Sequence, residues 1–267
     1  MSVLSNRRYL SLWLRRLSTD RIERRGSAPA EAFVVVASIK SAHRIAALTD
    51  SAARLGLKVG MGLADARAMY PGLPAVDAAP DADRHFLESI ADWCDRYTPL
   101  VGLDAPDGLL LDVTGCAHLF GGEAALLRDL VARLAQQGLR ARAAVADTVG
   151  AAWAVARYGS SAVIPDARDS ARSGIQRQSQ DSAPDSGFTC QRRAPRNDNT
   201  FRVVPRGETA TAILGFPIVS LRVDPDIAAD LNTAGLTCIA DLTERPRAPF
   251  AARFGKTLLL RLDQALG

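Results

Sequence analysis

The chain has 267 residues, of which 48% are hydrophobic and 23% are charged, and its formal net charge is +4. This composition is that of a folded globular protein and excludes a wholly disordered chain. The apolar runs are too short to span a bilayer and no secretory signal opens the sequence, so we expect a cytoplasmic protein without a membrane partner.

Four cysteines are widely separated and form no Cys-x-x-Cys pair, which argues against both a disulfide framework and a zinc site. Among the 33 basic residues only Lys40, Lys58 and Lys256 are lysine, so the other 30 (33 less 3) are arginine. Arginine suits bidentate contact with phosphate, although genome base composition produces the same bias.

Residues 9–14 predict a short apolar strand, and a Ser-Thr-Asp cluster after it begins a loop or a helix. Residues 33–37 are a continuous β-branched run, typical of a strand covered on both faces. We expect a compact helical region next. In it Thr49 or Asp50 caps a short helix, and residues 63–70 form a second helix.

Helical spacing of apolar residues predicts a helix over residues 81–97 that lies on a sheet. A strand pair centred on 101–113 follows, then a helix at 123–134, a strand at 140–146 and a helix at 148–157. With the first strand, this order is the split β-α-β-β-α-β pattern of an α+β fold.

The composition changes sharply at residues 166–199, where Ser, Gln, Arg, Asp, Asn and Pro dominate. Such a segment buries too little apolar surface to offset its ordering entropy, which predicts a disordered insertion. Residues 210–267 are mostly helical, and 231–242 predict a helix, a glycine turn and a second helix. A helix-hairpin-helix of this kind binds DNA phosphate through backbone amides, but a plain structural hairpin fits the same pattern.

Three stretches, in this order, resemble the Y-family of translesion DNA polymerases. Residues 56–73 are similar to its fingers motif, and residues 107–123 to its catalytic hairpin. The tail of the second stretch, Thr-Gly-Cys-x-x-Leu-Phe-Gly-Gly-Glu, resembles the ImuB-type branch, which is UmuC/DinB-like. The helical hairpin, followed by Arg253-Phe254-Gly255-Lys256 and by residues 262–267, is similar to the thumb.

The resemblance implies a ferredoxin-like palm with a fingers insertion and a helical thumb that contains a helix-hairpin-helix, the family's little finger being absent. The expected palm begins at residues 1–32 and continues at 76–165, with the fingers at 33–75 between these parts. The low-complexity insertion is expected at 166–200 and the thumb at 201–267.

Polymerisation by this family implies two Mg²⁺ ions about 3.5 to 4 Å apart, held by carboxylates. The resemblance places these three carboxylate positions at Leu14, Asp107 and Gly108, so only Asp107 survives. The family's triphosphate contacts fall on Asp50 and Ala53. We therefore expect a pseudoenzyme with a vestigial site, no metal and no cofactor, although it resembles a DNA-directed DNA polymerase.

The expected DNA contacts are Gly235, Thr237, Arg253 and Lys256 in the thumb. The implied function is that of a non-catalytic, DNA-binding adaptor in error-prone translesion synthesis and DNA repair during the SOS response. The implied partners are DNA, a catalytic C-family error-prone polymerase, the sliding clamp and a RecA-like, ImuA-type protein.

Two alternatives stay open. One is an active low-fidelity polymerase that uses Mg²⁺ with Asp104, Asp107 and Asp112. The other is a truncated remnant without a function of its own, because we expect the clamp and partner contacts of the family to lie in a C-terminal part beyond this chain.

Overall fold

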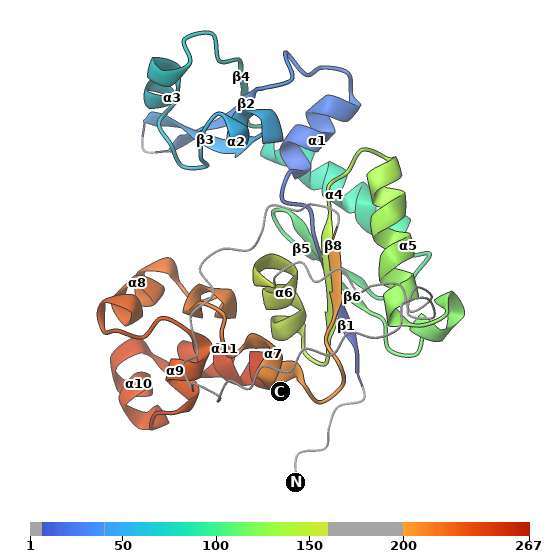
Figure 1. Cartoon of the computed structure of the whole chain (residues 1–267), viewed down its shortest axis with the longest axis vertical. Coiled ribbons are helices and arrows are strands. Elements are labelled where there is room, and N and C mark those ends of the chain that lie inside the picture. Colours follow the sequence, from blue (N-terminus) through green and yellow to red (C-terminus); the bar gives the residue numbers. More distant parts are fainter. Residues whose placement is uncertain (1–6, 40, 160–199) are drawn as a thin grey trace, which may run out of the picture.

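The computed structural model describes residues 7–39, 41–159 and 200–267. The described chain folds into a central α+β body, an upper α/β lobe and a helical lobe at the C-terminus (Figure 1). The insertion predicted at 166–200 lies, apart from Thr200, outside the described residues. No helix within these ranges is long and apolar enough to cross a membrane.

A five-stranded sheet forms the palm, with the strand order β5-β6-β1-β7-β8. Its central strand β1 is antiparallel to both β6 and β7, whereas β8 is parallel to β7. Strands β1, β5, β6 and β7 of this sheet confirm the predicted pattern, and β8 adds an edge strand that we did not predict. The strands are β1 (Tyr9–Trp13), β5 (Val101–Asp104), β6 (Gly108–Asp112), β7 (Arg142–Ala146) and β8 (Thr200–Val203).

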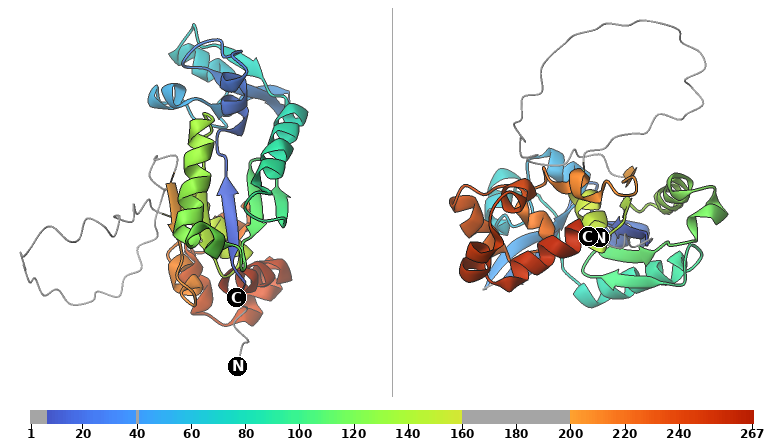
Figure 2. Two further views of the ribbon diagram at one scale, coloured as in Figure 1. Left: turned by 90° about the vertical axis from the view of Figure 1, so that its right-hand side faces the viewer. Right: turned by 90° about the horizontal axis from the view of Figure 1, so that it is seen from below.

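Helices cover both faces of this sheet (Figures 1 and 2). Leu10 and Leu12 of β1 belong to the apolar cluster under α4 and α5, whereas Tyr9 and Trp13 pack on the cluster around α6. This alternation follows from the two-residue period of a strand. The palm helices are α4 (Pro80–Cys94), α5 (Glu123–Gln136) and α6 (Val149–Tyr158), with the 3₁₀ turn η1 (Ala117–Phe120) before α5.

The fingers hold a second sheet, with the order β3-β2-β4, reached from the palm through α1 (Leu17–Arg24). Our expectation of a compact helical region directly after the first fingers strand is wrong in one respect, because β3 follows first and pairs antiparallel with β2. The prediction missed β3 because its sequence, AHRIAAL, is alanine-rich and buries Ile45 alone. The elements are β2 (Val34–Ile39), β3 (Ala42–Leu48), β4 (Ala75–Asp77), α2 (Asp50–Arg54) and α3 (Leu63–Met69).

The thumb packs against α6, so this helix separates the palm sheet from the thumb. The contact is close: a Cβ atom on Gly150 of α6 would lie 2.9 Å from the Cα atom of Ala265. The mostly helical thumb confirms the prediction. Its elements are α7 (Thr209–Ile213), η2 (Ile218–Leu221), α8 (Pro225–Thr233), α9 (Ile239–Thr243), α10 (Arg247–Phe254) and α11 (Lys256–Leu266).

A buried arginine ties the start of the palm to the start of the thumb. Arg8 donates from Nε and Nη2 to the Glu123 carboxylate at 2.7 and 2.6 Å, and from Nη1 to Asp147 at 2.7 Å. Asp147 also accepts from the backbone of Gly207 and from the Thr209 hydroxyl, at 2.8 and 2.9 Å. Glu123, the last residue of the stretch that resembles the ImuB-type branch, therefore has a structural role here.

Candidate functional site

One end of the palm sheet carries a row of residues from four neighbouring strands. Asp104 of β5 pairs with Gly108 of β6, Gly108 pairs with Trp13 of β1, and Trp13 pairs with Arg142 of β7. Asp107 lies in the short β5–β6 turn, where its carbonyl accepts a 2.8 Å bond from the Leu14 amide. The sheet register therefore brings Asp104, Asp107 and Trp13 to a common place.

The two carboxylates of this site, Asp104 and Asp107, have a hydrogen-bond donor at each of their four oxygens. Asp107 accepts from Trp13 Nε1 at 2.9 Å and from Arg157 Nη2 at 3.5 Å. Asp104 accepts from Arg157 Nη2 at 3.3 Å and from Arg222 Nη2 at 2.5 Å. Arg157 therefore bridges both carboxylates, and Arg222 reaches the palm from the thumb.

Two indole rings hold the arginines in place. The Arg157 guanidinium carbon lies 4.1 Å from the centroid of the Trp153 ring and 5.3 Å from that of Trp13. The guanidinium carbon of Arg222 lies 5.2 Å from the Trp153 ring. Cation–π contacts of this kind are strongest where the cation is partly desolvated. Arg142 adds a support, because it donates to the carbonyl oxygens of Arg157 and Gly159 at 3.3 and 2.5 Å.

Burial shifts the titration of the bridged groups in opposite directions. It raises the pKa of Asp107, an effect that the Trp13 hydrogen bond and the Arg157 charge reduce but do not cancel. Burial also lowers the pKa of Arg157, against the attraction of Asp107 and Asp104. An arginine stays protonated at neutral pH even so, because its ordinary pKa exceeds 12. The site therefore keeps a cation beside its carboxylates.

One predicted position lies away from this site. Leu14 is 1% exposed and joins the cluster under α4 and α5, so its side chain points away from this site. Trp13, one residue earlier, occupies the position beside Asp107. Asp107 lies at the site as predicted, and Gly108 lies next to it. Asp112 ends β6 at the other end of the strand, where its side chain accepts from the amide of Thr114 at 2.9 Å.

These residues do not fit a pair of Mg²⁺ ions. A metal at Asp104 and Asp107 would compete with Arg157 for the same oxygens. Gly108 leaves little room for a third carboxylate, because a Cβ atom there would lie 2.9 Å from Arg157 Nη2 and 3.0 Å from the Asp104 carbonyl oxygen. Within the described ranges, no group of three or more His, Cys, Asp or Glu side chains gathers at one point.

The predicted DNA contacts lie in two separate turns of the thumb. Gly235 lies between α8 and α9 with a φ of 78°, a left-handed conformation that favours glycine. The amides of Thr237 and Cys238 donate to Asp241 Oδ2 at 2.7 and 2.9 Å, and α9 has five residues. A phosphate would have to compete with Asp241 for these amides. The role of Gly235 and Thr237 in binding DNA stays a prediction.

The second turn of the thumb joins α10 to α11 and carries Arg253 and Lys256, which are both exposed. The guanidinium carbon of Arg253 lies 5.2 Å from the ring centroid of Phe254. Both cations can therefore meet a phosphate without breaking an ion pair with an acidic side chain that the described structure records. Their role in binding DNA also stays a prediction.

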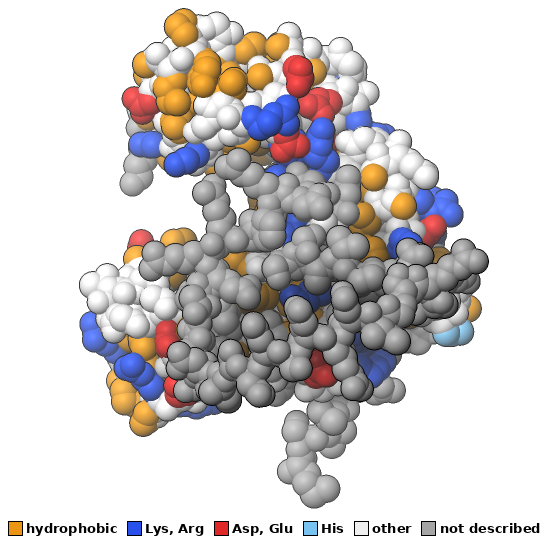
Figure 3. All heavy atoms as spheres, in the orientation of Figure 1, with side chains coloured by type: hydrophobic (Ala, Val, Ile, Leu, Met, Phe, Trp, Pro, Cys, Tyr) orange, Lys and Arg blue, Asp and Glu red, His pale blue; other side chains and the backbone are white. Residues whose placement is uncertain are grey.

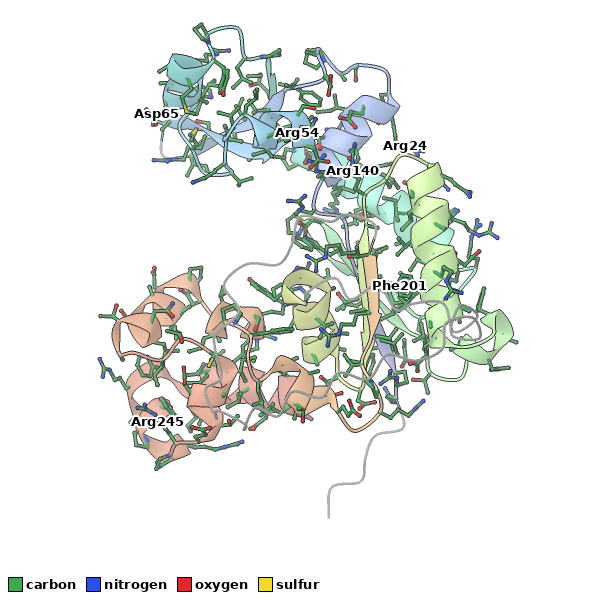
Figure 4. The ribbon with its side chains drawn as sticks, in the orientation of Figure 1. Arg24, Arg54, Asp65, Arg140, Phe201 and Arg245 are labelled. Carbon is green, nitrogen blue, oxygen red and sulfur yellow. The ribbon has the colours of Figure 1, made fainter. Side chains whose placement is uncertain are left out.

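A cavity of about 380 Å³ lies between the fingers and the turn after β1. Its lining includes Arg15, Arg16 and Lys58, together with apolar residues of β3 and α2. Asp50, at the start of α2, forms ion pairs with Arg15, Arg16 and Arg140. Figure 4 places Arg140 at the junction below the fingers. Asp50 therefore joins fingers to palm, a role that sequence reasoning did not assign to it.

Sequence reasoning missed four of the six side chains that form the palm site: Trp13, Trp153, Arg157 and Arg222. The tryptophans offered a weak signal, since the chain has only three and two of them meet here. Arg157 and Arg222 are 65 residues apart in the sequence (222 less 157), and no spacing pattern relates them.

A split β-α-β palm that carries a fingers sheet and a helical thumb is the fold of the Y-family DNA polymerases. The crystal structure of DinB from Sulfolobus solfataricus superposes with a TM-score of 0.67 at 17% identity, over 97% of this chain and 66% of that one. An insertion ternary complex of Dbh DNA polymerase superposes with a TM-score of 0.66 at 16% identity, over 97% and 67%. These likenesses establish the fold.

The chain belongs to the impB/mucB/samB family, which its residues 23–157 match. It is also 42% identical over 213 residues to Protein ImuB from two Caulobacter vibrioides strains, NA1000 / CB15N and ATCC 19089 / CIP 103742 / CB 15. The aligned region is 80% of this chain, but it spans only 38% of the length of either relative.

Proposed function

We propose that this chain is a DNA-binding accessory of translesion DNA synthesis that does not itself add nucleotides. The observation that carries this proposal is Arg157, whose guanidinium bridges Asp104 and Asp107. Two-metal catalysis requires carboxylates that are free to bind the ions. Gly108 and Leu14 stand where the resemblance places the other two carboxylates of a Y-family polymerase, and the β1 residue that contacts Asp107 is Trp13. The family and the polymerase fold support the translesion context.

Contact with DNA is supported by exposed and cavity-lining basic side chains on the fingers and on the thumb. Figure 3 shows the molecule hollowed between these lobes, with Lys and Arg side chains along the lower edge of the fingers. Arg15 and Lys58 line the cavity at the fingers, and Arg253 and Lys256 are exposed on the thumb. Binding through such phosphate contacts weakens steeply as the salt concentration rises, because the release of counterions from DNA then gains less free energy.

Primer extension with Mg²⁺ or Mn²⁺ and four nucleotides, run beside a fluorescence-anisotropy titration on the same primer-template, tests this function. We expect salt-sensitive binding without extension. Extension that disappears in Asp107→Ala would instead establish the active low-fidelity polymerase. The absence of both binding and extension would favour the remnant without independent function.

A matched pair of variants tests the DNA surface. Arg253→Ala with Lys256→Ala should lower affinity and reduce the salt slope by about 1 for each lost phosphate contact. The control removes two exposed cations from α4 and α5, Arg84 and Arg133, which form ion pairs within their own helices. Equal losses in both double variants would contradict a DNA surface on the thumb.

The adaptor part of this proposal names three protein partners: a catalytic C-family polymerase, the sliding clamp and a RecA-like, ImuA-type protein. Mixing each purified partner with the chain and measuring the complex by sedimentation velocity tests them one at a time. Because the chain covers only part of its relatives' length, a partner that binds a longer relative but not this chain would place its contact outside these residues.

A further inference from the structure

We propose that Arg157 is a resident cation of the palm, which permanently takes the place of a divalent ion at Asp104 and Asp107, and that Arg222, which shares Asp104 with it, fastens the thumb to this site. This inference goes beyond the proposed function, because it concerns the protein without DNA. It also makes a stronger statement than the loss of two carboxylates: Asp104 and Asp107 cannot bind a metal while Arg157 and Arg222 both occupy the site.

The first support is the position of the guanidinium. Arg157 Nη2 lies 3.3 Å from Asp104 Oδ2 and 3.5 Å from Asp107 Oδ1, and its side chain is 9% exposed. It also lies where a side chain at position 108 would begin, 2.9 Å from the ideal Cβ of Gly108. The arginine therefore fills the space that a hairpin carboxylate would need. Glycine at this position is a condition of the arrangement.

The second support is the charge balance. Asp104 and Asp107 together carry two negative charges, which the two positive charges of Arg157 and Arg222 balance. An isolated buried charge is costly, and breaking a buried pair leaves one behind. A divalent ion that entered this site would have to expel both guanidinium groups, and it would be repelled by them until they left.

The third support is that the cluster is held from both sides. Trp13 and Trp153 flank the Arg157 guanidinium with their rings, and Trp13 also donates to Asp107. Arg142 bonds to the carbonyl oxygen of Arg157 at the end of α6. Rotation of the Arg157 side chain away from the carboxylates would break its contacts with both rings together.

Arg222 extends the cluster to the thumb. It follows η2 with a φ of 60°, in the left-handed region that non-glycine residues seldom adopt. From there its guanidinium reaches Asp104 at 2.5 Å and lies over Trp153. A strained residue of this kind persists where surrounding contacts determine its conformation. Asp104, 5% exposed, is therefore the acceptor that joins Arg157 of the palm to Arg222 of the thumb.

Terbium luminescence tests the inference, because Tb³⁺ prefers the same oxygen ligands as Mg²⁺ or Ca²⁺ and emits when a nearby tryptophan is excited. We expect no saturable emission from the unaltered chain beyond that of Asp107→Asn. Arg157→Gln should gain saturable emission, and the double variant Arg157→Gln with Asp107→Asn should lose it. The control Arg133→Gln removes an exposed arginine paired with Asp129 and should gain nothing.

Arg222→Gln is the second test, for the case in which Arg157→Gln does not fold. It removes a partly exposed cation from the thumb and frees Asp104 Oδ1. We expect emission weaker than that of Arg157→Gln, and we expect Asp104→Asn to abolish it. Asp107-dependent emission from the unaltered chain, equal to that of Arg157→Gln, would overturn the resident cation. So would an absence of emission from both folded arginine variants. Primer extension is measured separately, so failure of the proposed function is distinguishable from failure of this inference.

Discussion

Trp13 and Asp107 are joined by a 2.9 Å hydrogen bond from the indole nitrogen to the carboxylate. The tryptophan lies at the end of β1, on the face of the sheet that α6 covers, beside the one carboxylate that sequence analysis assigned to the old catalytic site. An aromatic donor and two arginines thus occupy the surroundings of Asp104 and Asp107. The predictions below concern this cluster, the buried Arg8 network, the Asp20 carboxylate, and the Asp50 ion pairs between fingers and palm.

Gly108→Ala should lower the free energy of unfolding by about 1 to 3 kcal/mol, the usual cost of overpacking a filled site. The added Cβ would lie 2.9 Å from Arg157 Nη2 and 3.0 Å from the Asp104 carbonyl oxygen. The matched control is Gly102→Ala on neighbouring β5, where the nearest atom is 3.8 Å away. Urea unfolding of both variants checks this, and equal stabilities would contradict the close packing at position 108.

Arg8→Met should cost about 3 to 5 kcal/mol of stability, because it leaves two carboxylates without their buried partner. The Arg8 side chain is 1% exposed and bonds Glu123, Asp147 and the Val204 carbonyl. Arg7→Met, one residue away at an exposed position, should leave stability nearly unchanged. Thermal unfolding followed by circular dichroism compares the two, and a mild Arg8 variant would disprove the importance of the network.

Asp20 should make stability fall as the pH rises. Burial raises its pKa to about 6, against the lowering effect of Arg140, whereas an unfolded aspartate has a pKa of about 3.9. The folded chain thus holds this proton more tightly, so the extra stability is complete below about pH 4 and is lost as the pH rises through about 6.

Asp20→Asn lacks this titration. The stability of the unaltered chain relative to that variant should therefore fall by about 2 to 3 kcal/mol between pH 4 and pH 7. Urea unfolding at several pH values measures the difference between the two proteins. A difference that stays constant with pH, or that rises with it, would show that Asp20 is charged in the folded chain throughout.

Asp50→Ala should loosen the joint between fingers and palm with little effect on global stability. Its carboxylate pairs with Arg16 and Arg140 of the palm, but its side chain is 40% exposed, and exposed pairs contribute little. Hydrogen exchange should quicken in α1 and α2 while the palm sheet is unchanged. Asp65→Ala, on the exposed face of α3, serves as the control and should leave exchange unaltered in both helices.

Sequence reasoning succeeded where local pattern and local structure coincide. Apolar runs predicted β1 and β2, and helical spacing predicted α4. Of the two predicted helix caps, Thr49 and Asp50, it is the Thr49 hydroxyl that accepts the Ala52 amide, at 3.2 Å. These signals depend on neighbours within a few residues. The alanine-rich strand β3 and the edge strand β8 carry no such signal, and both were missed.

The sequence by itself determined the α+β class and the order of the palm elements and singled out Asp107, because each of these is written in short contiguous stretches. Only the tertiary structure decided which neighbour faces that carboxylate. The Leu14 side chain lies in the core, whereas the side chain of Trp13, one residue earlier, lies at the site, since successive side chains of a strand point to opposite faces. It also decided that Arg157 and Arg222 meet at Asp104, because α6 and the thumb come together only when their apolar faces are buried against each other.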